Sequence, residues 1–486
     1  MKKYKPPALP GTKKGLSIFT IIVSLLLLSL LIVFLMALTQ TPGDSSGSLP
    51  SFFQMGRQNM PLIFLFALAI FVIAFVNTDV ALIILIFSML LSPELRLVEV
   101  TQKAVVVRID DILLGVVFLG WLVRIAVHKE LGLIKQTSLN PLIIGYIVVC
   151  VVATVIGILT GRVTLARSFF FILKYFEYFL LYFMVTNIIR DRQQVENFVT
   201  AFLIAGLIIC VFGITQIGAI SRTTAPFEGE SAEPNTLGGY LLLLFSVCVG
   251  IFLYSPSSQW MLFAGALACL ILPPFIFTLS RSSYFSFIPM YLAFIIFSQK
   301  KKFFLIISMI GVVTLGPILV PQVGQVIRER VVSTFDSRRT FDAFGKSIPL
   351  ESSAAARVYS WQRVFKQWVK RPILGYGVTG VGLVDAQYPR VLGETGIIGF
   401  ALFIFLLSAI FRRVKYIFKT IRDDWAKGLA LGLLAGFIGL LFHALAANTF
   451  IIVRIMMPFW FLLAIVISLP RIYGSLDEAQ PQVEVR

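Results

Sequence analysis

Long apolar runs dominate the sequence, and they restrict the chain to very few folds. Fourteen runs are candidates for membrane spans. A helix needs about 20 apolar residues to cross a hydrocarbon core roughly 30 Å thick. Only helices and closed barrels satisfy every backbone polar group in lipid, and runs that are continuous rather than alternating in polarity indicate helices. The predicted fold is therefore an all-α polytopic transmembrane bundle of about 12 to 14 spans.

Composition supports this fold, because 58% of the residues are hydrophobic and only 14% are charged. The first run exceeds 20 residues and lacks a small-residue cleavage site, so it is predicted to be a retained helix rather than a signal peptide. The predicted spans are 16–38, 61–77, 79–92, 110–127, 140–160, 165–189, 197–218, 237–254, 260–279, 283–298, 303–321, 392–411, 427–447 and 450–469.

The placement of lysine and arginine predicts the orientation, since cytoplasmic loops are enriched in both. The N-terminal tail and the loops after every second span carry the basic clusters, so both termini are predicted to be cytoplasmic. The net charge of +18 then reflects these loops and does not indicate nucleic-acid binding. The four cysteines lie inside apolar runs without ligand spacing, so no disulfide, metal site or cofactor is predicted.

One long hydrophilic segment, 322–392, is predicted to lie outside the membrane. It separates an N-terminal bundle (1–321) from C-terminal helices (393–470) and a cytoplasmic tail (471–486). The segment holds eleven Lys and Arg against five Asp and Glu, a net charge of +6. That charge suits either attraction to anionic lipid headgroups or binding of an anionic substrate at the outer face.

Two patterns stand out within this outer segment. Residues 357–370 have apolar residues at helical spacing and basic residues elsewhere, which predicts an amphipathic helix at the membrane interface or packed over the bundle. The glycine-rich stretch 372–382 permits tight turns and close backbone approach to a ligand. It lacks the Gly-Lys-Ser/Thr of a nucleotide-binding loop.

Charged residues in or beside the spans are candidates for function, because charge in a membrane is costly. Lys174 and Glu177 are three residues apart and are expected to pair, a structural interaction. His443 is expected to be a hydrogen-bonded core residue. Several arginines are predicted near the outer ends of spans, and arginine presents a planar fork suited to phosphate oxygens. These outer arginines include Arg167, Arg281 and Arg454.

Four stretches in order resemble the O-antigen ligase and polymerase superfamily of bacterial envelope glycosyltransferases. They are Glu233-Pro-Asn235-Thr-Leu-Gly-Gly-Tyr240, Leu279-Ser-Arg281-Ser-Ser283, Arg357–Trp361 followed by Pro372–Gly377, and Asp385–Tyr388 followed by Leu392-Gly-Glu394-Thr-Gly-Ile-Ile-Gly399. The likeness covers roughly 200–410. It implies a metal-independent enzyme that moves glycan from an undecaprenyl-pyrophosphate-linked donor to an acceptor hydroxyl at the outer face of the cytoplasmic membrane.

The resemblance also implies roles for particular residues. Arg281 and Arg357 would bind the pyrophosphate, and further substrate-binding candidates are Glu233, Asn235, Arg167, Tyr388 and Glu394. Where ligases carry a His-Asn pair, this chain has Asp385 and Ala386. Asp385 would assist the acceptor hydroxyl as the catalytic residue, or would only cap the following helix. The missing His-Asn pair favours a polymerase-type or divergent transferase over a lipid A-core ligase.

Two other functional classes fit the same sequence. A transporter or flippase of lipid-linked or anionic substrates would also have many spans and an arginine-lined cavity. The sequence shows no convincing inverted repeat, and its charges concentrate outside rather than at mid-membrane, which favours the enzyme. The third class is a scaffold in an envelope-assembly complex. Sugar and acceptor identity are not readable from the sequence.

Overall fold

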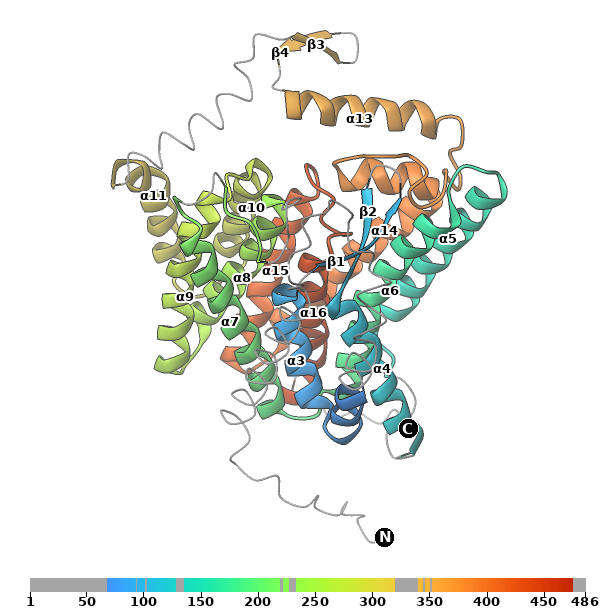
Figure 1. Ribbon diagram of the computed structural model, residues 1–486. Coiled ribbons are helices and arrows are strands. Elements are labelled where there is room, and N and C mark those ends of the chain that lie inside the picture. Colours follow the sequence, from blue (N-terminus) through green and yellow to red (C-terminus); the bar gives the residue numbers. More distant parts are fainter. Residues whose placement is uncertain are drawn as a thin grey trace, which may run out of the picture.

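The computed structural model describes residues 68–92, 94–100, 103–127, 135–218, 222–226, 233–319, 340–343, 346–349 and 352–474, and all structural statements concern these. It is an all-α polytopic bundle with two small antiparallel hairpins (Figure 1). The helices are α3 (Thr78–Leu91), α4 (Ile109–Val127), α5 (Asn140–Leu159), α6 (Leu165–Ile188), α7 (Arg192–Thr215), α8 (Pro234–Tyr254), α9 (Ser258–Phe277), α10 (Arg281–Phe297), α11 (Lys302–Leu319), α13 (Ser352–Trp368), α14 (Gln387–Thr420), α15 (Asp424–His443) and α16 (Val453–Tyr473).

Eight of the described helices are long and apolar enough to cross a membrane, and the chain is a multi-pass membrane protein. Shorter apolar helices cover Thr78–Met89, Arg281–Phe297 and Lys302–Gly311. Large apolar side chains face outward on the peripheral helices, such as Leu159 at 81% and Leu262 at 75% exposure. Lipid rather than water suits such a surface, since contiguous exposed apolar area is rare on soluble monomers.

The predicted spans from 79–92 onward each coincide with a helix, although several ends differ. Spans 16–38 and 61–67 lie outside the described residues, while 68–76 is helical. The helix predicted at 197–218 begins at Arg192, because the side chain of Asp191 caps it by accepting from Gln194 N–H at 2.9 Å. The helix predicted at 392–411 runs from Gln387 to Thr420, so the predicted boundary at 392 falls inside α14.

The sequence analysis missed one feature, an antiparallel hairpin of β1 (Glu94–Val100) and β2 (Lys103–Arg108) between α3 and α4. The second hairpin, β3 (Thr340–Ala343) with β4 (Lys346–Pro349), lies beyond α13 (Figure 1).

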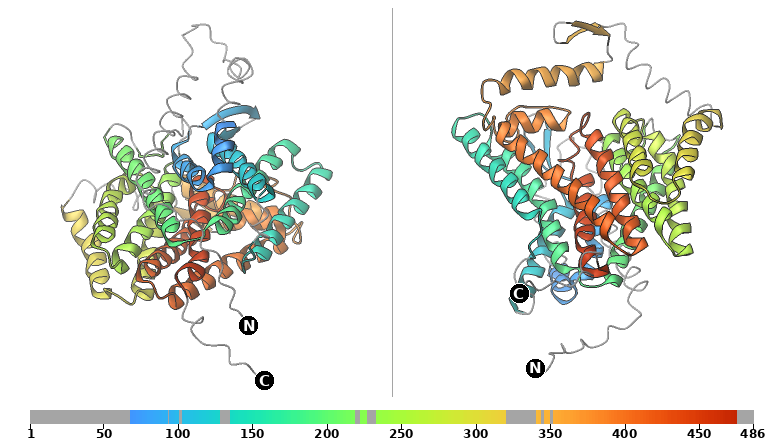
Figure 2. Two further views of the ribbon diagram at one scale, coloured as in Figure 1. Left: turned by 90° about the horizontal axis from the view of Figure 1, so that it is seen from below. Right: turned by 180° about the vertical axis from the view of Figure 1, so that it is seen from behind.

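The centre of the bundle is the close pairing of α8 with α15. Gly428, Gly432 and Gly436 recur every four residues on α15 and face α8. A Cβ at Gly432 would lie 2.8 Å from the carbonyl oxygen of Ser246, closer than atoms normally approach. Small residues at this spacing let two membrane helices pack backbone against backbone. On either side of this pair, α10 packs on α15 and α16 packs on α6 (Figure 2).

The predicted cytoplasmic loops share one face of the bundle. Arg192 pairs with Asp423 at 3.2 Å, Lys300 pairs with Asp424 at 2.9 Å, and Arg471 donates to the carbonyl of Ile189 at 2.7 Å. These contacts join the loops before α7, α11 and α15 to the end of α16. Helix α13 lies across the opposite end (Figure 1), as the alternation of the predicted spans requires.

The glycine-rich segment locks into a kink of α14. Gly396 has φ 65° and ψ −165°, which interrupts the helix. The carbonyls of Gly393 and Glu394 accept from the N–H groups of Tyr376 and Gly377 at 3.0 and 2.8 Å. Gly375 and Gly377 also have positive φ, a conformation that glycine adopts without strain. A Cβ at Gly375 would meet the backbone of α14 and one at Gly377 the backbone of α5, so these glycines permit close approach to two helices.

Helix α13 confirms the amphipathic helix predicted at 357–370, and it packs over the bundle. Its buried anchor is Val364, which packs with Val381 and Val384. Phe365 is 38% exposed. Arg363 Nη2 also donates to the carbonyl of Leu383 at 2.5 Å.

We predict that Gly432→Val lowers the free energy of unfolding by about 1–3 kcal/mol, because the added side chain meets the backbone of α8. Equilibrium unfolding of the purified protein in detergent measures the change. Gly115→Ala is the matched control, since a Cβ there meets nothing within 4 Å. An unfolding free energy equal to that of the parent protein would contradict the close α8–α15 pairing.

Candidate functional site

A cluster of small polar side chains lies where α8 and α10 begin. Ser280 caps α10 by accepting from the N–H of Ser283. Ser280 Oγ donates to Asn235 Oδ1 at 2.7 Å, and Ser282 Oγ reaches the same oxygen at 3.2 Å. A Cβ at Gly238 would lie only 2.2 Å from Ser283 Oγ, so glycine permits the approach of the two helices. The cluster therefore fixes the start of α10 against the start of α8.

His443, the last residue of α15, connects this cluster to the loop before α16. Its Nε2 lies 3.2 Å from Ser282 Oγ and 3.3 Å from Ser283 Oγ, and its Nδ1 lies 2.8 Å from Thr449 Oγ1. The imidazole is fully buried. This is the hydrogen-bonded core histidine that the sequence analysis expects, and it joins three helix ends at one point.

Arg281 and Arg357 come to this cluster from distant parts of the chain. Arg281 is the first residue of α10 and is half-buried. It stands between Ser280, which contacts Asn235, and Ser282, which contacts both Asn235 and His443. Arg357 belongs to α13 and lies within electrostatic reach of the imidazole of His443. The structure thus brings Asn235, Arg281 and Arg357 to one neighbourhood at the end of the bundle that carries α13.

Two further arginines brace the same region. Arg222 donates to the carbonyls of Thr278 and Leu279 at 3.0 and 3.1 Å, and so holds the turn that precedes Ser280. Arg454 donates to the carbonyl of Pro226 at 2.8 Å. The sequence analysis recognised Arg454 as an outer arginine but missed Arg222. The sequence did offer one signal for Arg222, because it is a basic residue in the short loop before Glu233 that is predicted to lie outside.

Asp385 lies in the connection that leads into α14, and its side chain is exposed. The N-cap of α14 is Ala386, and no side chain caps this helix, so Asp385 does not serve as its cap. Gln387 N–H donates to the carbonyl of Ala444 at 3.0 Å, and the side chain of Asn448 donates to the carbonyl of Val384. The backbone at Asp385 is therefore held against the loop that contains Thr449.

The remaining candidates divide into internal and peripheral residues. Glu394 is 1% exposed and accepts from Arg390 Nε at 3.0 Å and from the N–H of Thr379 at 2.9 Å. Tyr388 donates to the carbonyl of Leu441 at 2.8 Å. Through these contacts, the side chains of Glu394 and Tyr388 stabilise the packing around α14. Arg167 is half-buried near the start of α6, and Glu233 is exposed just before α8.

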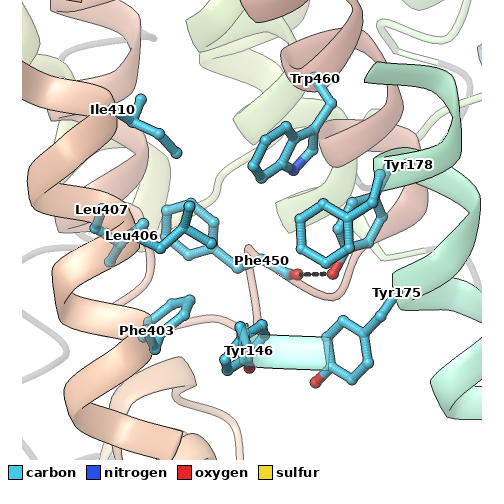
Figure 3. A pocket seen from close by; sticks show the side chains of 10 residues that line it. Tyr146, Tyr175, Tyr178, Phe403, Leu406, Leu407, Ile410, Phe450 and Trp460 are labelled. Atoms are coloured by element: carbon cyan, nitrogen blue, oxygen red, sulfur yellow. Dashed lines mark hydrogen bonds between the residues drawn. The ribbon is translucent and has the colours of Figure 1, made fainter. Parts of the chain in front are cut away.

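A small crevice between α5, α6, α14 and α16 has an almost wholly apolar lining (Figure 3). Aromatic rings dominate it, including Tyr146, Tyr178 and Trp460, and Tyr178 donates to the carbonyl of Phe450 at 3.1 Å. No charged residue lines it among those described. The crevice therefore does not coincide with the arginine-bearing site.

Comparison with known proteins finds no matching family model and no matching curated relative.

We predict that His443→Ala lowers the free energy of unfolding by about 1–3 kcal/mol, because it leaves buried hydroxyls of Ser282, Ser283 and Thr449 without this partner. Thermal unfolding in detergent checks the change. The control is Thr160→Ala, which removes an exposed hydroxyl that bonds only within its own helix turn. Equal losses in both variants would show that His443 does not join the three helix ends.

Proposed function

We propose that the chain is a membrane glycosyltransferase of the O-antigen ligase and polymerase type. It takes glycan from an undecaprenyl-pyrophosphate-linked donor and transfers it to an acceptor hydroxyl on a glycan or lipid. The reaction occurs at the outer face of the cytoplasmic membrane, with both chain termini in the cytoplasm. The missing His-Asn pair at Asp385 and Ala386 favours the polymerase form, in which the acceptor is another lipid-linked repeat.

One observation carries this proposal. Arg357, from the long outer segment, lies within electrostatic reach of His443, whose ring contacts Ser282 and Ser283, the two residues that follow Arg281 at the start of α10. Two arginines more than 70 residues apart in the chain thus approach one cluster. Guanidinium groups suit phosphate oxygens because they are planar, carry several donors and stay charged in apolar surroundings.

The proposed step is a single displacement. The oxygen of the acceptor hydroxyl forms a bond to the anomeric carbon while the bond from that carbon to the pyrophosphate oxygen breaks, so the configuration inverts. Arg281 and Arg357 stabilise the negative charge that grows on the departing undecaprenyl pyrophosphate. The hydroxyl proton passes to the carboxylate of Asp385, which is exposed at the same end of the bundle and then releases it to water.

We predict that Arg281→Ala and Arg357→Ala each lower transfer on the order of 100-fold, the scale of losing one charge-stabilising donor. The assay incubates the purified protein with a lipid-pyrophosphate glycan and candidate acceptors, and follows release of undecaprenyl pyrophosphate. Lys366→Ala is the control for Arg357, because it removes an exposed cation from the same helix. Undiminished transfer in both arginine variants would overturn the pyrophosphate assignment.

We predict that Asp385→Asn lowers kcat by on the order of 100-fold or more, with little change in KM or in thermal stability, because the carboxylate is exposed and serves only the proton transfer. Asp424→Asn, at the opposite end of the bundle, is the control. A variant with normal kcat would remove Asp385 from the mechanism.

A transporter or flippase remains the second candidate, and one observation favours it. The sequence analysis expects charges to concentrate outside rather than at mid-membrane, but the structure buries a group of charged side chains deep between α4 and α6. Movement of intact donor between the leaflets of proteoliposomes, without cleavage of the pyrophosphate bond, would establish this candidate. Transfer with release of undecaprenyl pyrophosphate would establish the enzyme.

A further inference from the structure

Five charged side chains form a connected group between α4 and α6. Arg108 Nη2 pairs with Asp110 at 2.6 Å and approaches Asp111 at 4.0 Å. Lys174 pairs with Asp111 and, at 3.4 Å, with Glu177. Lys174 lies nine residues after Leu165, the outer start of α6, which at 1.5 Å per residue is about 14 Å. The group therefore lies well inside α6, against the N-terminal end of α4.

The charges within this group do not balance. Arg108 and Lys174 bring two positive charges, whereas Asp110, Asp111 and Glu177 bring three negative ones. The side chains of the five residues range from 0% to 20% exposure. An uncompensated charge at such depth is costly, so the group favours one further positive charge.

Glu177 is the least compensated of the three carboxylates. Asp110 accepts from Arg108 and from Ser92 Oγ, both at 2.6 Å, and Asp111 accepts from the N–H of Arg108 at 2.8 Å and from Lys174. Glu177 makes one ion pair among the described residues, with a lysine that already pairs with Asp111. Its side chain is 7% exposed.

Two buried oxygens in the group have no hydrogen-bond partner in the described part of the chain, Glu177 Oε2 and Asp111 Oδ1. A buried polar atom without a partner is rare in native structures and calls for an explanation such as an unseen ligand. Protonation of Glu177 removes the excess negative charge of the group, and it lowers the cost of burying the side chain, because an ionised carboxylate without a full set of partners is costlier to bury than the neutral acid.

Among the described residues, no charged group other than Lys174 makes an ion pair with Glu177. From α14, the Arg390–Glu394 ion pair is internally neutral. From α16, Arg454 reaches the carbonyl of Ser92 at 3.5 Å, on the side of Asp110. The remaining titratable neighbours are uncharged near neutral pH, namely Tyr146 and Cys150 on α5 and Tyr175 and Tyr178 on α6.

We propose that Glu177 is a proton-binding site buried between α4 and α6, occupied at neutral pH and held in place by Lys174 and Asp111. The site is separate from the arginine cluster at the start of α10, and the inference does not depend on the proposed glycosyl transfer. A carboxyl that gains and loses one proton in this buried position changes the charge between α4 and α6 by one unit, which is the kind of group that couples a membrane protein to a proton gradient.

Infrared spectroscopy of the full-length protein in lipid nanodiscs tests this directly. A protonated carboxylic acid has a carbonyl stretching band that a carboxylate lacks, and a glutamate with its ordinary pKa of about 4.3 is ionised at pH 7. We expect the band at pH 7 in the parent protein and in Glu196→Gln, which removes a carboxylate paired with Arg192 near the start of α7. We expect its loss in Glu177→Gln.

Three results would overturn the proposal: no such band at pH 7, a band that persists in Glu177→Gln, or a band lost in Asp111→Asn but not in Glu177→Gln. Replacing sodium with choline must leave the band unchanged, since a sodium-dependent band would identify a metal cation rather than a proton.

Thermal unfolding supplies a second measurement. Glutamine resembles the protonated acid in shape and charge, so Glu177→Gln should have a Tm at pH 7 equal to or above that of the parent protein. If Glu177 were ionised and paired with Lys174, the same substitution would break a buried ion pair and lower the Tm. A lowered Tm would therefore also overturn the proposal.

Discussion

The contact of α8 with α15 through glycine backbones is the constraint on which the rest of the structure depends. Lipid supplies no hydrophobic force between helices, so their association relies on close packing. The glycines of α15 allow that packing along its length, from Gly428 to Gly436. One consequence is that His443, two turns beyond Gly436, arrives beside the starts of α8 and α10. The polar cluster is thus a product of how the two central helices approach each other.

Hydropathy predicted most of the described helices because the bilayer imposes one length and one composition on every span. It could not predict where helices continue past the membrane, as α14 does through Arg412 and Arg413 to Thr420. The hairpin β1–β2 was missed because its residues join two apolar runs with few turn signals. The glycine repeat of α15 was readable in the sequence, but its partner helix was not, since spacing alone does not say which helix lies opposite.

Part of the candidate site could also be predicted from the sequence, but not from hydropathy. Asn235 and Arg281 were identified because each stands in a short polar motif at the outer end of a span, whereas Arg357, inside the long outer segment, was identified only through the family resemblance. Arg222 was missed because its position in a short outer loop shows a basic residue there, but not that its side chain bonds to backbone carbonyls. The Lys174–Glu177 pair was predicted from its spacing and is confirmed at 3.4 Å, but its partners Asp110 and Asp111 were missed because they begin an apolar run, and an average over that run hides them. Only the fold shows that Lys174 faces them.

The hydrogen bonds between the glycine-rich segment and the kink of α14 at Gly396 lie next to the C-terminal end of α13, and its N-terminal end is far from them along the helix. Main-chain bonds from Tyr376 and Gly377 to α14, with the contacts of Val364 and Arg363, hold the C-terminal half of α13 to the bundle. Any rotation of α13 therefore pivots near Trp368, and displacement grows toward Ser352. Arg357 lies further from this pivot than Val364 does, so a small tilt of α13 moves the guanidinium of Arg357 further than it moves Val364.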